Sequence, residues 1–260
     1  MEPETLLFTD MAGDRADLQD VIYDGLEVDY SSRYPALLRL LEDGTAAHQL
    51  YACAMLASWA VPEALRTIAR WASEPAATPW GDAPVTVERF GGVDAAFELL
   101  ADAVRIAADA RARDAAVDAL RAEAIRAILA VFDRVYVGRA VFLVLELDPA
   151  LAARMRAEIG PAVERALSTL RAQPAFDLAT QTASLLGALA AIDDDHAARA
   201  AEALLANADG RTRIKNEVAY ALRFGTGPAS LAVLDWLADG GSESVRDLAR
   251  ESVAVRRPRP

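Results

Sequence analysis

The chain has few of the residues from which disulfide, metal-binding and membrane-spanning structures are built. Cys53 is its one cysteine, which excludes an internal disulfide framework and fits a reducing compartment. His48 and His196 are its two histidines, too few for a metal site of several His and Cys ligands. The most apolar run, residues 140–145, has six residues. A membrane span needs roughly 20, so we expect no metal, no cofactor and no membrane partner.

Short catalytic and targeting signatures are absent as well. The sequence contains no GxGxxG, GxxxxGK[ST] or HExxH pattern. The opening MEPETLLFTD lacks the basic start of a signal peptide, which predicts a cytoplasmic protein. A formal net charge of −12 disfavours nucleic acid as the partner, because that affinity rests largely on Lys and Arg. Lys215 is the single lysine, and a chain so rich in Arg and Ala is typical of a GC-rich, for example actinobacterial, genome.

Helical periodicity dominates what is present. With 53% hydrophobic and 25% charged residues the composition is globular. Residues 34–73 predict three helices, 34–42, 45–59 and 63–72, with Thr45 as an N-cap and Pro62 near a helix start. The middle helix is apolar on two sides, which indicates packing on two sides, as in a stack of helical hairpins. Further helices are expected at 14–25, 93–110, 114–135, 138–147, 149–160, 161–172, 177–191, 195–206, 212–224, 229–238 and 243–254.

Two segments carry a family resemblance. LLRLLEDGT at 37–45 followed by ACAMLASWAVPEAL at 52–65 resembles a HEAT repeat, and AYALRFGTGPASLAVLDWLADGGSESVRDLARESV at 219–253 resembles the same unit. The resemblance, which is to HEAT-like proteins of actinobacterial type, implies an all-α fold. It implies one domain, 1–260, a right-handed α-solenoid of antiparallel helix pairs that is irregular in the middle.

Three segments depart from the repeat. Residues 1–33 are acidic, and we expect either a polar cap on the stack or a docking surface for a basic partner. Residues 73–92 form a Pro-rich loop with Trp80 and Phe90, whose aromatic rings either pin the loop to the helices or contact a ligand or partner. Residues 255–260 are expected to form a loose basic tail.

Candidate partner-binding residues follow from helical spacing. On the predicted helix 212–224, four side chains fall at i, i+3, i+7 and i+10 and form either a polar stripe facing a groove or an ordinary solvated face. Gln181, on an earlier helix, could continue that surface, and Trp80 is the aromatic candidate in the loop. The four residues of the stripe are Arg213, Asn216, Tyr220 and Arg223.

Other chemistry-bearing residues favour structural roles. The run 193–196, Asp-Asp-Asp-His, could hold a hard cation, but its place at a helix start favours capping. Trp59, Trp71 and Trp236 lie on apolar helical faces, which favours packing between helices.

The resemblance and the charge together indicate function. HEAT proteins mostly bind other proteins, and an acidic rigid scaffold captures a basic partner quickly. We therefore expect a non-enzymatic interaction scaffold for a basic protein, with an immunity or antitoxin role as one case. The alternative is a HEAT-like enzyme, a DNA glycosylase or lyase acting in the concave groove. The sequence does not indicate an oligomeric state.

Overall fold

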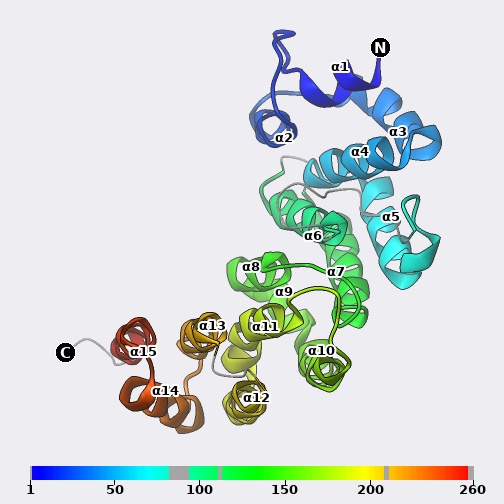
Figure 1. Cartoon of the computed structure of the whole chain (residues 1–260). Helices are drawn as coiled ribbons and strands as arrows, with labels where there is room; N and C mark the ends of the chain where they lie inside the picture. Colours follow the sequence, from blue (N-terminus) through cyan, green and yellow to red (C-terminus); the bar gives the residue numbers. More distant parts are fainter. Residues whose placement is uncertain (1, 82–93, 111–112, 208–210, 257–260) are drawn as a thin grey trace. The chain divides into compact units, whose positions relative to one another are not determined.

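The computed structural model describes residues 2–81, 94–110, 113–207 and 211–256 (Figure 1). Helices are the regular structure of this part of the chain, and one isolated antiparallel bridge joins Thr9 and Arg15. None of the described helices is both long and apolar enough to cross a membrane. Where the sequence predicts one domain, the chain divides into two compact units: unit 1, Met1–Val131, and unit 2, Phe132–Pro260.

Unit 1 is built around α4. This helix packs against α2, α3, α5 and α6, and its residues from Ala52 to Ser58 are all buried. The prediction of a helix packed on two sides is therefore confirmed. The bounds in unit 1 are α1 Pro3–Phe8, α2 Leu18–Glu27, α3 Tyr34–Asp43, α4 Ala46–Ser58, α5 Pro62–Ser73, α6 Ala96–Ile106 and α7 Ala115–Ala130, with 3₁₀ turns at Ser31–Arg33, Pro75–Ala77 and Ala107–Asp109.

The C-terminal end of α4 anchors the first helices. The Trp59 indole N–H donates to the carbonyl of Ile22 in α2 at 3.0 Å, and the rings of Tyr30 and Tyr34 lie 5.1 and 5.9 Å from the Trp59 ring. Gly25 of α2 sits directly against the indole, where a Cβ atom would overlap it. Trp59 is thus a packing residue, as its helical face predicted.

Arg33 fastens the chain's first ten residues. It is buried, and its guanidinium donates to the carbonyls of Leu6, Thr9 and Asp10 at 3.3, 2.7 and 2.7 Å. It also lies over the Tyr30 ring, 4.7 Å from the centroid. One side chain therefore satisfies three carbonyls that follow or end α1 and have no helical partner.

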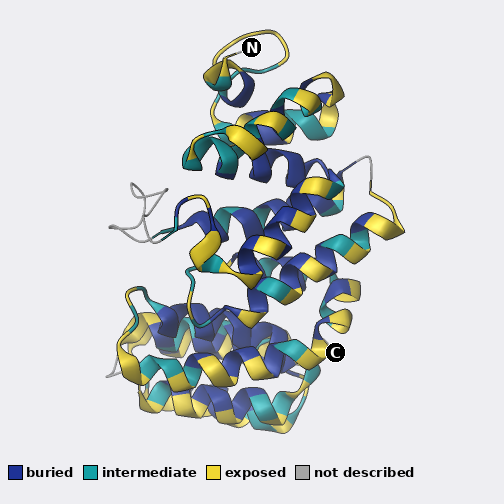
Figure 2. Cartoon of the chain, turned by 90° about the vertical axis from the view of Figure 1, so that its right-hand side faces the viewer, coloured by how far each residue is buried: buried dark blue, intermediate teal, exposed yellow. Residues whose placement is uncertain are grey.

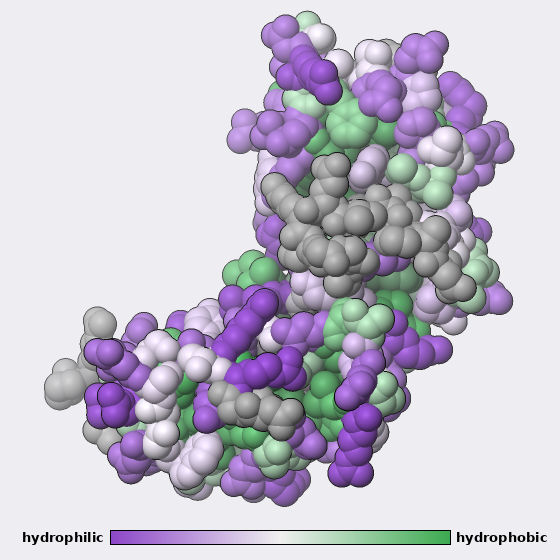
Figure 3. All heavy atoms as spheres, viewed as in Figure 1, coloured by the Kyte–Doolittle hydropathy of each residue, from purple (hydrophilic) through white to green (hydrophobic). Residues whose placement is uncertain are grey.

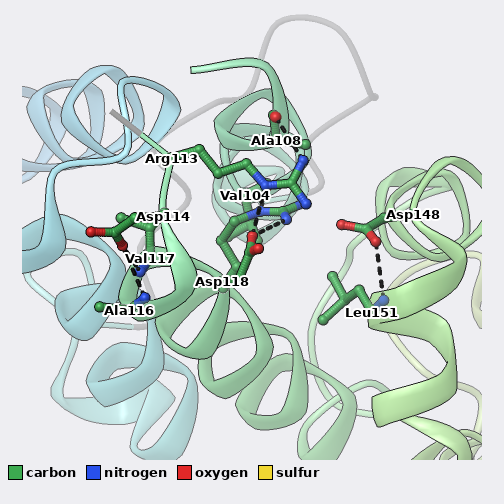
Figure 4. Close-up of polar contacts among 10 residues, drawn as sticks. Val104, Ala108, Arg113, Asp114, Ala116, Val117, Asp118, Asp148 and Leu151 are labelled. Atoms are coloured by element: carbon green, nitrogen blue, oxygen red, sulfur yellow. Dashed lines mark hydrogen bonds and ion pairs between the residues drawn. The ribbon is translucent and has the colours of Figure 1, made fainter. Parts of the chain in front are cut away.

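A second buried arginine joins α6 and α7. Arg121 donates to the carbonyl of Val104 at 3.1 Å and to the carboxylate of Asp118 at 3.1 Å, and Arg113 donates to the same carboxylate at 2.8 Å (Figure 4). Burial alone would raise the pKa of Asp118, but the hydrogen bonds from both arginines outweigh it and lower the pKa. Asp114 caps α7 by accepting from the N–H groups of residues 116 and 117.

Unit 2 is built around α11, which packs against α8, α10, α12 and α13 and is buried from Leu178 to Ala190. Helices α13 and α15 pack together, as do α12 and α14, and α14 and α15. Figure 2 shows the buried inner faces and exposed outer faces of these helices. The bounds in unit 2 are α8 Ala140–Leu147, α9 Pro149–Arg154, α10 Arg156–Thr169, α11 Leu178–Ile192, α12 Asp194–Ala206, α13 Thr212–Leu222, α14 Pro228–Gly240 and α15 Glu243–Arg256, with a 3₁₀ turn at Leu170–Ala172.

The sequence prediction matches some of the helix limits and misses others. The helices predicted over 34–72 match α3, α4 and α5 to within one residue at each end. The break expected at Gly160-Pro161 is wrong, because α10 runs through Pro161, whose fixed φ suits a helix and whose missing N–H costs one hydrogen bond. The helix predicted over 114–135 ends at Ala130, and a turn follows.

The expected loose tail is also corrected in part. Residues 255 and 256 belong to α15, and Arg256 donates to the carbonyl of Gly227 at 2.5 Å. Residues 257–260 lie outside the described residues. The tail prediction was wrong at its first two positions because a buried partner holds the basic side chain.

Candidate functional site

The predicted polar stripe lies on α13. The helix buries Ile214, Val218 and Leu222 against unit 2, so residues on its other faces reach the surface. Arg213 is exposed, and within the described part of the chain it has no hydrogen bond or ion pair. Asn216 is half-buried, and its side-chain oxygen is buried with no hydrogen-bond partner among the described residues. Among the described residues, no hydrogen bond, ion pair or ring contact joins the side chains of these two residues to the rest of the stripe.

Tyr220 and Arg223 do come together, at the centre of what we term the arginine–aromatic cluster: Arg139, Phe142, Tyr220, Arg223 and Phe224. The Arg223 guanidinium lies over the Tyr220 ring, 4.6 Å from its centroid, and over the Phe224 ring at 5.3 Å. The guanidinium of Arg139, which precedes α8, lies over the same Tyr220 ring at 5.0 Å. The Tyr220 ring therefore lies close to two guanidinium groups. The side chains of Tyr220 and Arg223 are both half-exposed.

Phe142 and Phe224 supply the apolar base of the cluster. Their ring centroids lie 5.5 Å apart, and those of Phe142 and Tyr220 lie 6.3 Å apart, edge to face. Phe142 is buried against Gly187 of α11, where a Cβ would come within 2.5 Å of the Phe142 ring. The absence of a side chain at Gly187 thus lets the ring, and with it the cluster, sit on α11.

One carboxylate faces the cluster among the described residues. Glu217 lies 3.9 Å from the Arg139 Nε, at the outer limit of an ion pair, and the hydroxyl of Ser184 donates to it at 3.5 Å. The side chain of Arg139 is 44% exposed and that of Glu217 20% exposed. Arg223 has no carboxylate partner in the described part of the chain, so the cluster carries net positive charge in a chain of net charge −12.

Gln181 was expected to continue the polar surface, and the structure corrects this. It is buried, and its amide oxygen accepts from the N–H groups of Val137 and Gly138 at 2.8 and 3.1 Å. Its amide nitrogen donates to the carbonyls of Phe132 and Val135 at 2.7 and 3.1 Å. All of its bonds shown go to the turn 132–138, so the side chain holds that turn beside α8 instead of facing a partner.

Trp80 is buried in unit 1. Its ring centroid lies 5.1 Å from that of Trp71 and 6.1 Å from that of Phe97, both edge to face. Its placement matches the alternative in which the aromatic rings of the loop pin it to the helices. Phe90 lies outside the described residues.

Residues of the acidic run 193–196 make three structural contacts. Asp193 caps α12 by accepting from the His196 N–H, and the His196 ring pairs with Glu164 of α10 at 2.6 Å. Asp194 accepts from the N–H of Ser230 at 3.0 Å, at the start of α14. Among the described residues no group of three or more His, Cys, Asp or Glu side chains is placed to hold a metal ion.

The pKa of the Asp194 carboxyl is lowered in the folded chain. Burial alone would raise its pKa, but hydrogen bonds from Ser230 and Gly227 and the charge of Arg256, 3.7 Å away, outweigh burial and lower it. Gly225 and Gly227 lie so close to this carboxylate that a Cβ on either would meet it. The contact joins the starts of α12 and α14 to the end of α15 and has a structural role.

A second surface lies at the start of unit 1. We use the term acidic surface for the exposed carboxylates and large hydrophobic side chains of residues 2–29, among which Arg15 is exposed as well: Glu2, Glu4, Met11, Asp14, Asp17, Asp20, Tyr23, Glu27, Val28 and Asp29. Met11, Tyr23 and Val28 are 45, 42 and 39% exposed and make up half of the six exposed large hydrophobic residues among those described. Over these N-terminal helices Figure 3 shows a mainly hydrophilic surface with hydrophobic side chains between.

Sequence reasoning missed Arg139 and Phe142. They lie about 80 residues before Tyr220, next to or within the apolar run 140–145, and only tertiary packing brings them to Tyr220. Comparison of the chain with protein-family models, with curated proteins and with solved structures gave no match.

Proposed function

We propose that the chain is a non-enzymatic interaction scaffold that binds a basic protein through the acidic surface. The observation that carries the proposal is the coincidence, within residues 2–29, of seven exposed carboxylates and three exposed large hydrophobic side chains. Protein interfaces combine apolar anchors with a charged rim that sets partner choice and association rate. Such a surface would suit an immunity or antitoxin-like role.

Of the two arginines in residues 2–33, one is committed to the main chain, and the His48 ring lies 3.6 Å from Glu4. Arg15 is exposed, but Arg33 is buried and its guanidinium is committed to three carbonyls. Tyr23 accepts a hydrogen bond from Arg105 at 3.2 Å, which holds the ring at the surface. Because Arg33 and Trp59 hold the segment on α3 and α4, its carboxylates are presented from a fixed backbone and lose little conformational entropy on binding.

For the architecture we propose the HEAT-like arrangement, a right-handed α-solenoid of antiparallel helix pairs. Packing of alternate helices within each unit supports it: α4 with α6 and α5 with α7 in unit 1, and α11 with α13 and α12 with α14 in unit 2. Stacked helix pairs make such contacts between one pair and the next. An experimental structure with left-handed or unstacked pairs would contradict this part of the proposal.

The binding proposal is tested with two variants of equal charge. The triple variant Glu2→Gln, Asp14→Asn, Asp20→Asn removes three carboxylates from the acidic surface, and none of these side chains caps a helix. The control, Asp235→Asn, Asp239→Asn, Glu251→Gln, removes three exposed carboxylates from α14 and α15. The probe is a fluorescein-labelled decalysine peptide, measured by anisotropy at low salt.

We expect the triple variant to weaken decalysine binding about fivefold and the control less than twofold. Equal weakening would show that the peptide responds to net charge alone and would reject the acidic surface. The apolar part is tested separately with a peptide of alternating Lys and Trp, whose binding Met11→Ser and Val28→Ser should weaken while leaving decalysine binding unchanged.

A further inference from the structure

The arginine–aromatic cluster of unit 2 has a charge opposite to that of the whole chain. Arg139 and Arg223 both lie within 5.0 Å of the centroid of the Tyr220 ring, so their guanidinium centres are less than 10 Å apart. Like charges held this close repel each other, and the surrounding structure offers the one distant carboxylate of Glu217. The arrangement therefore gains stability when a further anion lies beside it.

The described residues leave N–H donors of both guanidiniums available. A guanidinium carries five N–H donors in one plane, and its contact with a ring does not require them as hydrogen-bond donors. The Arg223 guanidinium makes no hydrogen bond within the described residues, and the Arg139 side chain is 44% exposed. The aromatic contacts fix where the donors lie, so a ligand does not have to order two flexible side chains.

We propose that the arginine–aromatic cluster binds an acidic peptide segment of a partner protein, with carboxylates of neighbouring residues on Arg139 and Arg223. The site is separate from the acidic surface and selects ligands of opposite charge. Arginine paired with carboxylate is the planar, charge-assisted contact that guanidinium geometry favours. Arginine and tyrosine are also the residues in which binding energy concentrates at protein interfaces.

A peptide fits these observations better than a nucleic acid. Single-stranded nucleic acids bind along grooves in which many cations track the phosphates. Here two arginines face the site, Glu217 lies beside them, and the chain as a whole repels polyanions. A short acidic segment needs two such contacts and little surrounding positive charge.

The test uses fluorescein-labelled decaglutamate with the full chain, by anisotropy at low ionic strength. Arg223→Ala and Arg139→Ala should each weaken binding about fivefold. Arg213→Ala is the matched control, because it removes the same charge from an exposed position on the same helix outside the cluster, and it should weaken binding less than twofold. Equal weakening by all three variants would overturn the proposal.

Two further variants separate the contribution of the Tyr220 ring to binding from that of the positive charge. Tyr220→Phe keeps the ring and should bind decaglutamate as the unchanged chain does, whereas Tyr220→Leu removes the ring without changing the charge and should weaken binding as much as Arg223→Ala. Circular dichroism confirms that each variant is folded, and Arg223→Gln, which also removes the charge, replaces Arg223→Ala if the latter is not. No measurable binding of decaglutamate, or tighter binding of the oligonucleotide dT10 than of decaglutamate, would overturn the proposal.

Discussion

Arg33 in unit 1 and Gln181 in unit 2 perform the same task with different chemistry. Each is buried and holds an irregular segment through main-chain hydrogen bonds. Arg33 only donates, and it meets three carbonyls; Gln181 donates to two carbonyls and accepts from two N–H groups. The side chain is matched to the polar groups that the segment presents: carbonyls at and after the end of a helix in one case, and both N–H groups and carbonyls of a turn in the other.

The largest expected effect is at Gln181. Gln181→Ala leaves two N–H groups and two carbonyls of the turn 132–138 without their partner in a buried place, and we expect a loss of about 3 kcal/mol in the free energy of unfolding. Urea unfolding followed by circular dichroism measures it. Gln49→Ala is the control, because Gln49 makes its hydrogen bonds at a more open position, at 2.8 and 3.5 Å. Equal losses from both variants would show that the turn does not depend on Gln181.

Each unit also contains a helical glycine against an aromatic ring, and these give the next effect. Gly25→Ala forces a methyl group onto Trp59, and Gly187→Ala forces one onto Phe142. Overpacking of this kind costs about 2 kcal/mol, which thermal unfolding would show as a lowered Tm for both variants. Gly240→Ala has open space around it and should leave Tm unchanged or slightly raised. A neutral result at Gly25 or Gly187 would contradict the close packing.

Substitution of Arg33 should cost less than substitution of Gln181. Arg33 makes three hydrogen bonds to the main chain against four for Gln181, and two of the three are only partly buried, so water can replace part of the loss. We expect Arg33→Ala to lower the free energy of unfolding by about 1.5 kcal/mol. Tryptophan fluorescence suits the measurement because Trp59, Trp71 and Trp80 belong to unit 1. Exposed Arg15 is the control, and an equal effect of Arg15→Ala would remove the distinction.

The smallest effect is a pH dependence that each unit shows through one carboxylate. The pKa values of Asp118 and Asp194 are lowered in the folded chain. Their stabilisation is therefore present above the unfolded pKa of about 4 and is lost as the pH falls through the folded pKa. The side chain of Asp194 is 12% exposed against 32% for Asp118, so Asp194→Asn should reduce the acid sensitivity more than Asp118→Asn. Urea midpoints at pH 7 and pH 3 test this order, and the reverse order would contradict it.

The sequence predicted helices, caps and the central position of α4 well, because these depend on neighbours in the chain. Thr45 accepts from the His48 N–H as an N-cap should, and α5 begins at Pro62. The helix through Pro161 escaped prediction because local rules favoured a break. The burial of Gln181 escaped it because its partners lie in another part of the chain, more than 40 residues away.

The candidate site could be predicted only by half. Helical spacing brings Tyr220 and Arg223 to neighbouring positions of one helix, and the structure places them in contact. Helical spacing could not identify Arg139 and Phe142, because their contacts with α13 span some 80 residues of chain. The same spacing grouped Arg213 and Asn216 with Tyr220, although among the described residues no hydrogen bond, ion pair or ring contact joins their side chains to Tyr220. A stripe on a helix identifies residues that share a direction, and packing decides which of them share a site.

Cys53 is the one cysteine of the chain, so its rate of reaction with a thiol reagent can report on local opening of unit 1. Cys53 is fully buried in α4, its thiol lies 3.6 Å from the carbonyl of Ala64, and burial raises its pKa. A thiol-reactive reagent can reach it only when the helices around α4 separate. Because the sequence has no other cysteine, the labelling rate measures how often the helices around α4 open, and no reporter group has to be introduced into unit 1.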